Sequence, residues 1–295
     1  MPANFPEIWS KRVRERLTTL TNAPWLTGVE ELDMDVTVMG EGSAGEQNLV
    51  HIPITLVDPD VLINNTTYPL TVVKYDDTGV TIALDKYQTL PTSVSDDAIQ
   101  GASYSKIDAT TRGHVRNITE KKYQKAIHAL APDADSANTP IVKKSDNAND
   151  VYKSIVALKD KFDQLQVPAE GRVLVLSSND HNALLLDRER YGNLLSNINT
   201  GDTAPVIAGF KVYTYIGNPY FTDAGVKKAF GTVNDETDVQ ASVAFSLSNT
   251  VMKTGFTKQY FRKSDIDPEN QTNVLAYRHY FIACPVQKKF IGAII

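Results

Sequence analysis

The chain has 295 residues, of which 42% are hydrophobic and 22% are charged. This composition is typical of a folded globular protein and excludes disordered, collagenous and coiled-coil proteins. The 30 lysines and arginines against 35 acidic residues give a formal net charge of −5, without the overall basic excess of a nucleic-acid-binding protein. The length, near the limit of a single hydrophobic core, predicts one elaborate domain or two closely connected ones.

The single cysteine, Cys284, excludes an intrachain disulfide framework and is typical of a reducing cytoplasm. It follows the apolar run 280–283, which predicts a thiol buried in a strand. The first residues lack the pattern of a signal peptide, and no apolar run approaches the roughly 18 residues of a membrane span. We therefore expect synthesis in the cytoplasm and no membrane partner.

Residues 1–33 predict an N-terminal arm with a short helix over 8–20, between prolines. The basic side chains of this helix gather on one side; they are Lys11, Arg12, Arg14 and Arg16. We interpret them as a solvated helix face, with a contact to an acidic partner or nucleic acid as the alternative.

Residues 34–100 carry a β signal, because β-branched residues alternate with polar ones between turn residues. The expected strands are 36–38, 49–57, 70–75 and 79–84. This stretch has too few large residues for a core of its own. It therefore predicts long hairpins that project and are completed by a neighbouring molecule.

Two helices are predicted next, the first over 104–131, with Gly113 weakening its early half. The second, over 149–166, begins at a cap formed by Asn147 or Asn149 and ends before Pro168. Its apolar side chains recur at steps of three and four residues; they are Val151, Ile155, Leu158, Phe162 and Leu165. We hypothesise that this second helix is the spine of the subunit, with its stripe against the terminal strands.

The remaining pattern mixes strands and helices without strict alternation, which indicates an α+β fold. A short helix over 181–187 is expected to be capped by Ser178 or Asn179. The expected strands are 172–176, 210–216, 239–247, 273–283 and 286–295.

Two motifs suggest a ligand site and are rejected on their context. The run 40–45 matches G-x-G-x-x-G, with Asp58 and Asp60 following, but a dinucleotide site must open a helix, whereas 49–57 is predicted to be a strand. The run 265–270 begins like a calcium loop but lacks the glycine at its sixth position and the glutamate at its twelfth. We interpret the first as a hairpin tip and the second as a turn.

No other pattern indicates catalysis or metal binding. Asp33 and Asp35 form a pair without a third ligand, and no G-x-S-x-G elbow is present. The histidines lack ligand spacing; they are His51, His114, His128, His181 and His279. We therefore assign no catalytic, cofactor-binding or metal-binding residue and expect no cofactor. A soluble enzyme with a ligand domain over 171–258 is the distant alternative.

In their order along the chain, these parts resemble the major capsid (coat) proteins of tailed bacteriophages, whose shell fold is named after phage Hong Kong 97 (HK97). The resemblance covers nearly the whole chain, and 79–87, 94–97 and 167–176 look most like coat-protein segments. It implies an α+β, HK97-like capsid fold and no enzymatic activity. The implied parts are an N-terminal arm (1–33), an extended β loop (34–100), a peripheral domain with a long spine helix (101–170), an axial domain (171–258) and terminal strands returning to the peripheral domain (259–295).

The resemblance also implies a function and partners. The subunit would assemble with itself, as hexamers and pentamers, into an icosahedral head that encloses double-stranded DNA through weak, non-specific contact. A portal and a separate scaffolding protein would be further partners, with assembly in the host cytoplasm and a final place in the virion capsid. An encapsulin-like compartment is the alternative. Some relatives crosslink through Lys and Asn, but we match no crosslink motif to Lys74, Lys86, Asn249 or Asn270.

Overall fold

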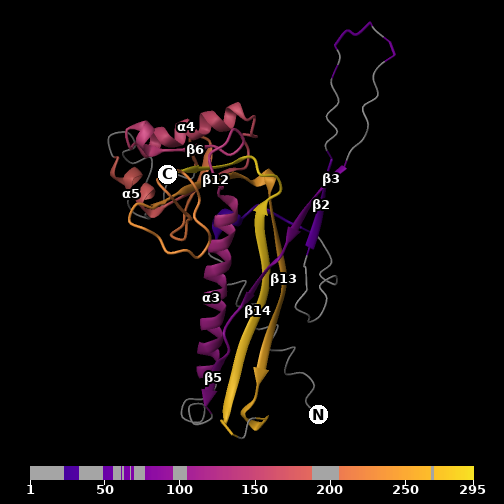
Figure 1. The fold of residues 1–295 in the computed structure, drawn as a ribbon, viewed down its shortest axis with the longest axis vertical. Helices are drawn as coiled ribbons and strands as arrows, with labels where there is room; N and C mark the ends of the chain where they lie inside the picture. The colour runs from indigo at the N-terminus through magenta and orange to yellow at the C-terminus, as the bar shows by residue number, and fades with distance from the viewer. Residues whose placement is uncertain are drawn as a thin grey trace. The chain divides into compact units, whose positions relative to one another are not determined.

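The computed structural model of the chain describes residues 23–32, 49–55, 61, 63–66, 68–69, 77–95, 105–187, 206–266 and 269–295. Two compact units are present, residues 35–84 and the remainder, and each is considered by itself (Figure 1). Several predicted features lie outside the described residues: the helix at 8–20 with its basic side chains, the strands at 36–38 and 70–75, and the glycine-rich run 40–45.

The unit of residues 35–84 contains an antiparallel pair, β2 (Leu49–Thr55) and β3 (Asp77–Ala83). The register runs from Leu49 opposite Ala83 to Thr55 opposite Asp77, which confirms a long hairpin. Between the strands, Val61, Ile63 and Tyr68 are 85%, 84% and 74% exposed. These apolar side chains are exposed.

The larger unit contains a six-stranded sheet in the order β6-β15-β12-β7-β9-β8. Its strands are β6 (Ile141–Val142), β7 (Arg172–Leu176), β8 (Val206–Ile207), β9 (Phe210–Thr214), β12 (Ser242–Ser246) and β15 (Ile291–Ile294). The β7–β9 and β15–β6 pairs are parallel, and the other pairs are antiparallel. This mixed sheet confirms the α+β prediction.

The central strand β7 is buried on both faces, which explains the apolar run 173–176 that follows Arg172. Val173 and Val175 belong to the cluster on one face, together with the last turns of a long helix. Leu174 and Leu176 alternate to the other face and join a second cluster. The sheet therefore has a hydrophobic core on each side.

The second core is made by helix α4 (Val151–Gln164), which begins at Asp150. The Asp150 carboxylate accepts from the backbone N–H of Lys153, so Asp150 is the cap, whereas our prediction named Asn147 or Asn149. Asn149 instead adopts a left-handed backbone with φ of 57°. The predicted stripe is confirmed as part of the subunit interior: Val151, Ile155, Leu158 and Phe162 are buried, and Leu165 is partly buried.

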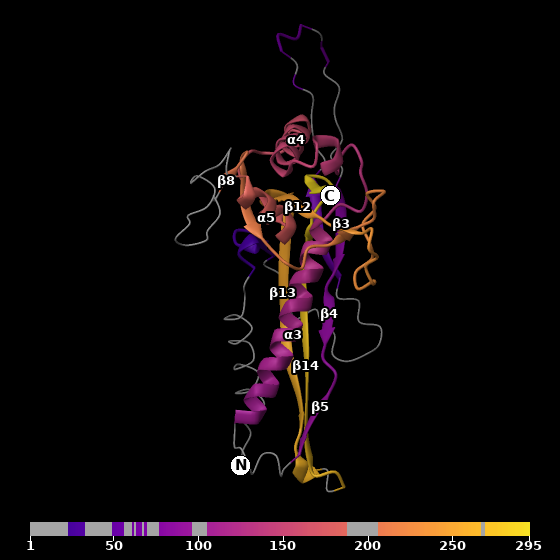
Figure 2. The same ribbon diagram turned by 90° about the vertical axis from the view of Figure 1, so that its left-hand side faces the viewer.

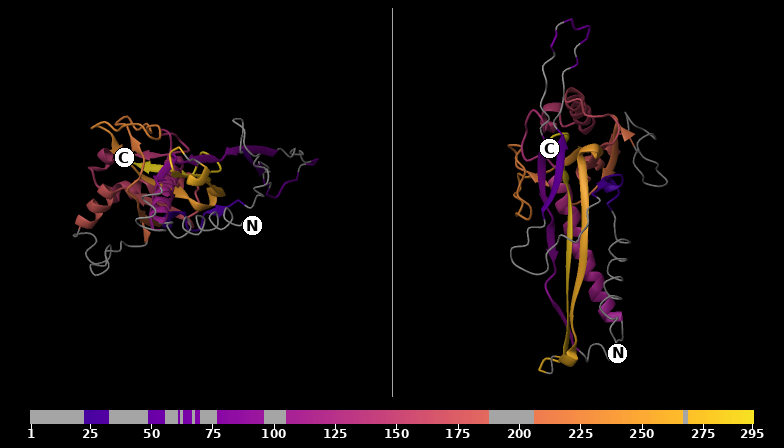
Figure 3. Two further views of the ribbon diagram at one scale, coloured as in Figure 1. Left: turned by 90° about the horizontal axis from the view of Figure 1, so that it is seen from below. Right: turned by 90° about the vertical axis from the view of Figure 1, so that its right-hand side faces the viewer.

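The larger unit also contains a five-stranded sheet built on a long hairpin of β13 (Thr250–Arg262) and β14 (Thr272–Pro285) (Figure 3). The other strands are β1 (Glu30–Glu31), parallel to β13, and β4 (Asp85–Gln88) and β5 (Thr92–Ser95), both antiparallel to β14. Our sequence reading missed β13. It placed 85–95 in the extended loop, whereas these residues pair with β14.

The longest helix is α3 (Ser105–Leu130), which is longer than α4, the helix that our hypothesis makes the spine of the subunit. Its first half packs Val115 and Ile118 against Leu275 and Tyr277 of β14. Its last turns enter the core of the six-stranded sheet. Figures 1 and 2 show α3 running beside the β13–β14 hairpin. One helix therefore joins the two sheets.

The segment 23–32 is packed against the larger unit. Trp25, in the short 3-10 helix η1 (Pro24–Leu26), is fully buried and meets Tyr123 and Phe245 edge-on. The Lys253 ammonium donates to the carbonyl oxygen of Leu32. The described part of the predicted arm is thus anchored.

The remaining elements connect these parts. The helix α5 (Ser178–Leu186) begins at Ser177, whose hydroxyl accepts from the N–H of Asp180, rather than at the predicted Ser178 or Asn179. The short pieces are η3 (Lys144–Asn147), β10 (Tyr220–Phe221), β11 (Val239–Gln240), η4 (Leu247–Asn249) and η5 (Ser264–Ile266).

Candidate functional site

Among the described residues, no three His, Cys, Asp or Glu side chains lie close enough to hold a metal ion. The His114 ring packs on the Tyr277 ring, with the ring centres 5.2 Å apart. His128 bonds the Lys228 carbonyl oxygen, and His279 Nδ1 lies 2.9 Å from the hydroxyl of Thr257. Within the described part of the chain, the structure therefore brings no histidines together as ligands.

The most unusual titratable pair is Lys122 and His279, both buried between α3 and β14. The Lys122 ammonium lies 4.6 Å from the ring centre of Phe281 and 5.1 Å from that of Tyr123. Burial lowers the pKa of Lys122 to about 8, with an opposing effect from Glu31. Burial, together with the nearby Lys122 charge, lowers the pKa of His279 to about 3. Both side chains are part of the packing between α3 and β14.

A serine, an aspartate and a lysine also meet inside the molecule. The Ser242 hydroxyl donates to Asp180 over 2.6 Å, and the Lys144 ammonium donates to the other Asp180 oxygen over 2.7 Å. Ser242 also accepts from the backbone N–H of Ser177. Because every one of these contacts joins α5 to β12 or η3, we interpret the network as a structural tie.

The predicted strand thiol, Cys284, lies in β14 and is only half-buried. Burial first, and the Asp85 carboxylate second, raise the pKa of Cys284 to about 11. The thiol is thus not activated as a nucleophile.

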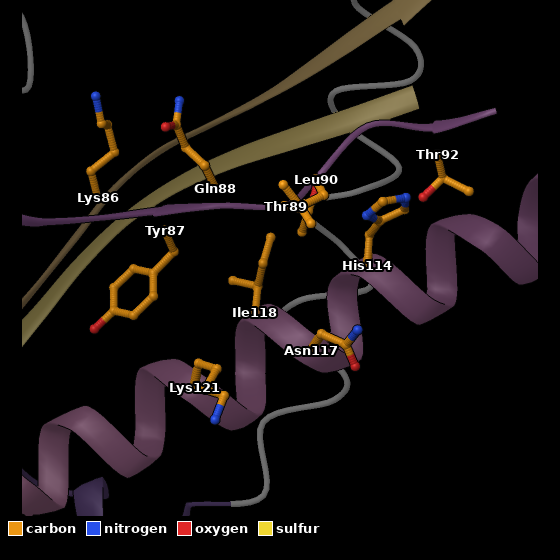
Figure 4. Close-up of a pocket in the computed structure, with 10 residues that line it drawn as sticks. All are labelled: Lys86, Tyr87, Gln88, Thr89, Leu90, Thr92, His114, Asn117, Ile118 and Lys121. Atoms are coloured by element: carbon orange, nitrogen blue, oxygen red, sulfur yellow. The ribbon is translucent and has the colours of Figure 1, made fainter. Parts of the chain in front are cut away.

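A pocket of about 520 Å³ lies between α3 and the β4–β5 edge (Figure 4). It is lined on α3 by His114, Asn117, Ile118 and Lys121, and on the strand side by residues 86–90 and 92. Figure 4 shows Lys86 and Gln88 pointing away from α3, on the opposite side of the strand from Tyr87. No carboxylate is among the described residues that line this pocket.

The described surface carries several large apolar side chains that are more than half exposed. In the larger unit they are Leu90, Leu186, Val206, Ile216, Val233 and Ile266. They are spread over both sheets and the connecting loops, and single exposed apolar side chains are common on protein surfaces. They are candidate contacts to neighbouring molecules in an assembly.

The other residues singled out in the sequence are separate from one another. Asp265 is exposed beside the hairpin turn, and Lys86 and Asn270 are exposed. The Asn249 amide is buried and donates to the carbonyl oxygens of Gln287 and Lys289. Asp33, Asp35, Asp58, Asp60 and Lys74 lie outside the described residues.

No helix among the described residues is long and apolar enough to cross a membrane. No curated protein matches the chain.

Solved structures of phages and of a virus-like particle share the fold. The protein of Mycobacterium phage Che8 aligns with a TM-score of 0.55 at 17% identity, covering 85% of each chain. The capsid structure of cyanophage P-SCSP1u gives 0.60 at 12% identity, covering 90% of this chain and 88% of the other. A virus-like particle from Pyrococcus furiosus gives 0.59 at 7% identity, covering 99% and 100%. At these identities the likeness concerns the fold.

The family is established by sequence. Residues 77–294 match the model of a family described as phage capsid protein. The match favours a phage head over the encapsulin-like compartment and over an enzyme. The chain therefore belongs to the phage capsid protein family: it is a structural, non-enzymatic major capsid protein that self-assembles into the shell of a tailed-phage virion.

Proposed function

We propose that this subunit forms hexamers and pentamers of an icosahedral head that is assembled in the host cytoplasm and filled with double-stranded DNA. The family match over 77–294 is the observation that carries the proposal. Weak, non-specific contact with DNA agrees with the net charge of −5. A portal and a separate scaffolding protein complete the assembly.

The parts of the chain have different roles in this proposal. The arm 1–33 ties the subunit to its surroundings, and the extended loop packs on neighbouring subunits. The domains predicted at 101–170 and 171–258 form the peripheral and axial parts, joined by the terminal strands 259–295. The loop boundary is best placed at residue 84, because 85–95 pair with β14.

Electron microscopy of the purified chain, expressed alone and with its scaffold, tests the proposal. Closed shells with sixfold and fivefold capsomers are expected. A stable monomer under every assembly condition, with scaffold supplied, contradicts it.

A further inference from the structure

The β13–β14 hairpin has a charge unlike that of the whole chain. Neither strand contains an Asp or Glu, although the chain has a net charge of −5. The basic residues of the two strands are Lys253, Lys258, Arg262 and Arg278. A local excess of positive charge attracts a negatively charged partner.

Lys258 and Arg278 lie on the face of the hairpin opposite α3. Leu275 and Tyr277 pack against α3, and residues of alternate parity in a strand point to the other face. Lys258 and Arg278 are direct partners across the strands, and Arg278 is also the partner of Gln88. This face therefore extends over β4, where Lys86 and Gln88 point away from α3 (Figure 4).

The positive charges on this face are not neutralised within the described part of the chain. No ion pair there involves Lys86, Lys258 or Arg278. Like charges directly opposite each other destabilise a strand pair. Lys258 and Arg278 instead share the Tyr260 ring, at 5.5 and 5.2 Å from its centre. We call Lys86, Lys258, Tyr260 and Arg278 the basic stripe.

The same sequence contains a segment with the complementary charge. Residues 35–84 include one basic residue, Lys74, against seven acidic ones, a net charge of −6. The acidic residues are Asp35, Glu41, Glu46, Asp58, Asp60, Asp76 and Asp77. This segment also exposes Val61, Ile63 and Tyr68, which match the apolar centre that Tyr260 provides at 38% exposure.

We propose that the basic stripe of one subunit binds the acidic segment 35–84 of a second copy of the chain. The inference rests on the proposed packing of the extended loop on neighbouring subunits and identifies the residues that receive it. An anionic partner removes the repulsion between Lys258 and Arg278, and the apolar side chains are buried at the same contact. Duplex DNA is the competing polyanion and is an outcome of the test.

Charge reversal with a matched control gives the first test. Lys258→Glu is compared with Lys211→Glu, because Lys211 is also an exposed strand lysine with its ammonium 5.5 Å from a tyrosine ring, that of Tyr213. We expect Lys258→Glu to lower shell yield at low salt about tenfold and Lys211→Glu to leave it unchanged. Adding Asp58→Lys and Asp60→Lys to Lys258→Glu should restore the yield. Equal yields for the two single variants, or failure of the added lysines to restore assembly, overturn the inference.

Zero-length carbodiimide crosslinking of parent particles gives the second test. Mass spectrometry should find Lys258 joined to a carboxylate of residues 35–84, and mixing isotopically light and heavy subunits should show that the two come from different copies. Particles that lack this crosslink, or in which only DNA protects Lys258 from modification, contradict the inference and leave the proposed function intact. A parent chain that forms no particles contradicts the proposed function itself.

Discussion

The side-chain ammonium of Lys227 lies 2.8 Å from the backbone carbonyl oxygen of Ala131, the residue after the last turn of α3. The same ammonium donates to the carbonyl oxygen of His128 and pairs with Asp133 at 2.8 Å. The last carbonyl groups of a helix have no partner within it and carry partial negative charge. Lys227 therefore caps α3 from a distant loop.

Replacing Lys227 by Met should destabilise the subunit by about 1.5–3 kcal/mol, the usual effect of losing hydrogen bonds to a charged group. Lys288→Met is the control, since Lys288 pairs with the same Asp133 but is 85% exposed, and it should cost less than about 1 kcal/mol. Urea unfolding of unassembled subunits measures both. Equal effects of the two substitutions would show that the cap contributes nothing beyond a surface ion pair.

Truncating the α4 stripe should unfold the subunit rather than only prevent assembly. Leu158→Ala or Phe162→Ala leaves a cavity between α4 and the sheet, at a cost of roughly 2–5 kcal/mol. Lys153→Ala, at an exposed position, should change stability by about 0.5 kcal/mol or less. Thermal unfolding and soluble yield check this. A Phe162→Ala subunit as stable as the parent contradicts the prediction.

Gly292 in β15 should not tolerate a methyl group. A Cβ atom there would lie 2.9 Å from both Leu158 Cδ1 and Phe162 Cε2. Gly292→Ala is therefore expected to destabilise the subunit by about 1–3 kcal/mol through overpacking. Gly113→Ala, in α3 with no atom near its would-be Cβ, should instead stabilise it by about 0.5–1 kcal/mol. Differential scanning calorimetry should show Tm shifts of opposite sign; shifts of the same sign would rule out close packing at Gly292.

Lowering the pH should destabilise the subunit through His279, which is buried between α3 and β14. Its pKa is lowered to about 3 in the folded state, from an ordinary value of 6.5, so the unfolded chain binds more protons between these two pH values. The free energy of unfolding therefore falls as pH decreases from 6.5 to 3. His279→Gln should reduce this slope, measured by urea unfolding at several pH values. An unchanged slope would mean that other groups cause the acid sensitivity.

Lys122→Met separates the two causes of the His279 shift. Removing the neighbouring charge should move the pKa of His279 upward, toward its ordinary value, and so weaken the acid dependence. Because burial is the larger cause, the dependence should decrease without vanishing.

The sequence predicted α4 and β7 well. Helix α4 is buried on one side, so its apolar residues recur every three or four positions. Strand β7 is buried on both faces, so its apolar residues follow one another directly. It misplaced the α4 cap because Asn149 and Asp150 are both good capping residues, and the left-handed backbone at Ala148 and Asn149 decides between them. This backbone geometry depends on contacts distant in sequence. The N–H of Asn149 donates to the carbonyl oxygen of Lys144 in η3, and the N–H of Lys144 donates to the carbonyl oxygen of Ile295.

The long strand β13 was missed for a different reason. One face is exposed along much of its length, and its register shifts between Thr254 and Thr257, so its alternation is irregular. The candidate surfaces were equally hidden from sequence, because the basic stripe combines residues from β4, β13 and β14. Its only sequence signal was the lack of acidic residues in β13 and β14 against seven in 35–84.

The position of α3 limits how the larger unit can change shape. At 1.5 Å per residue its 26 residues span about 39 Å, and its two halves are set in two different hydrophobic cores. The two sheets are thus fixed to one rod. A change in the angle between them must bend α3, for which Gly113 is the weakest helical position, or must repack one of its faces.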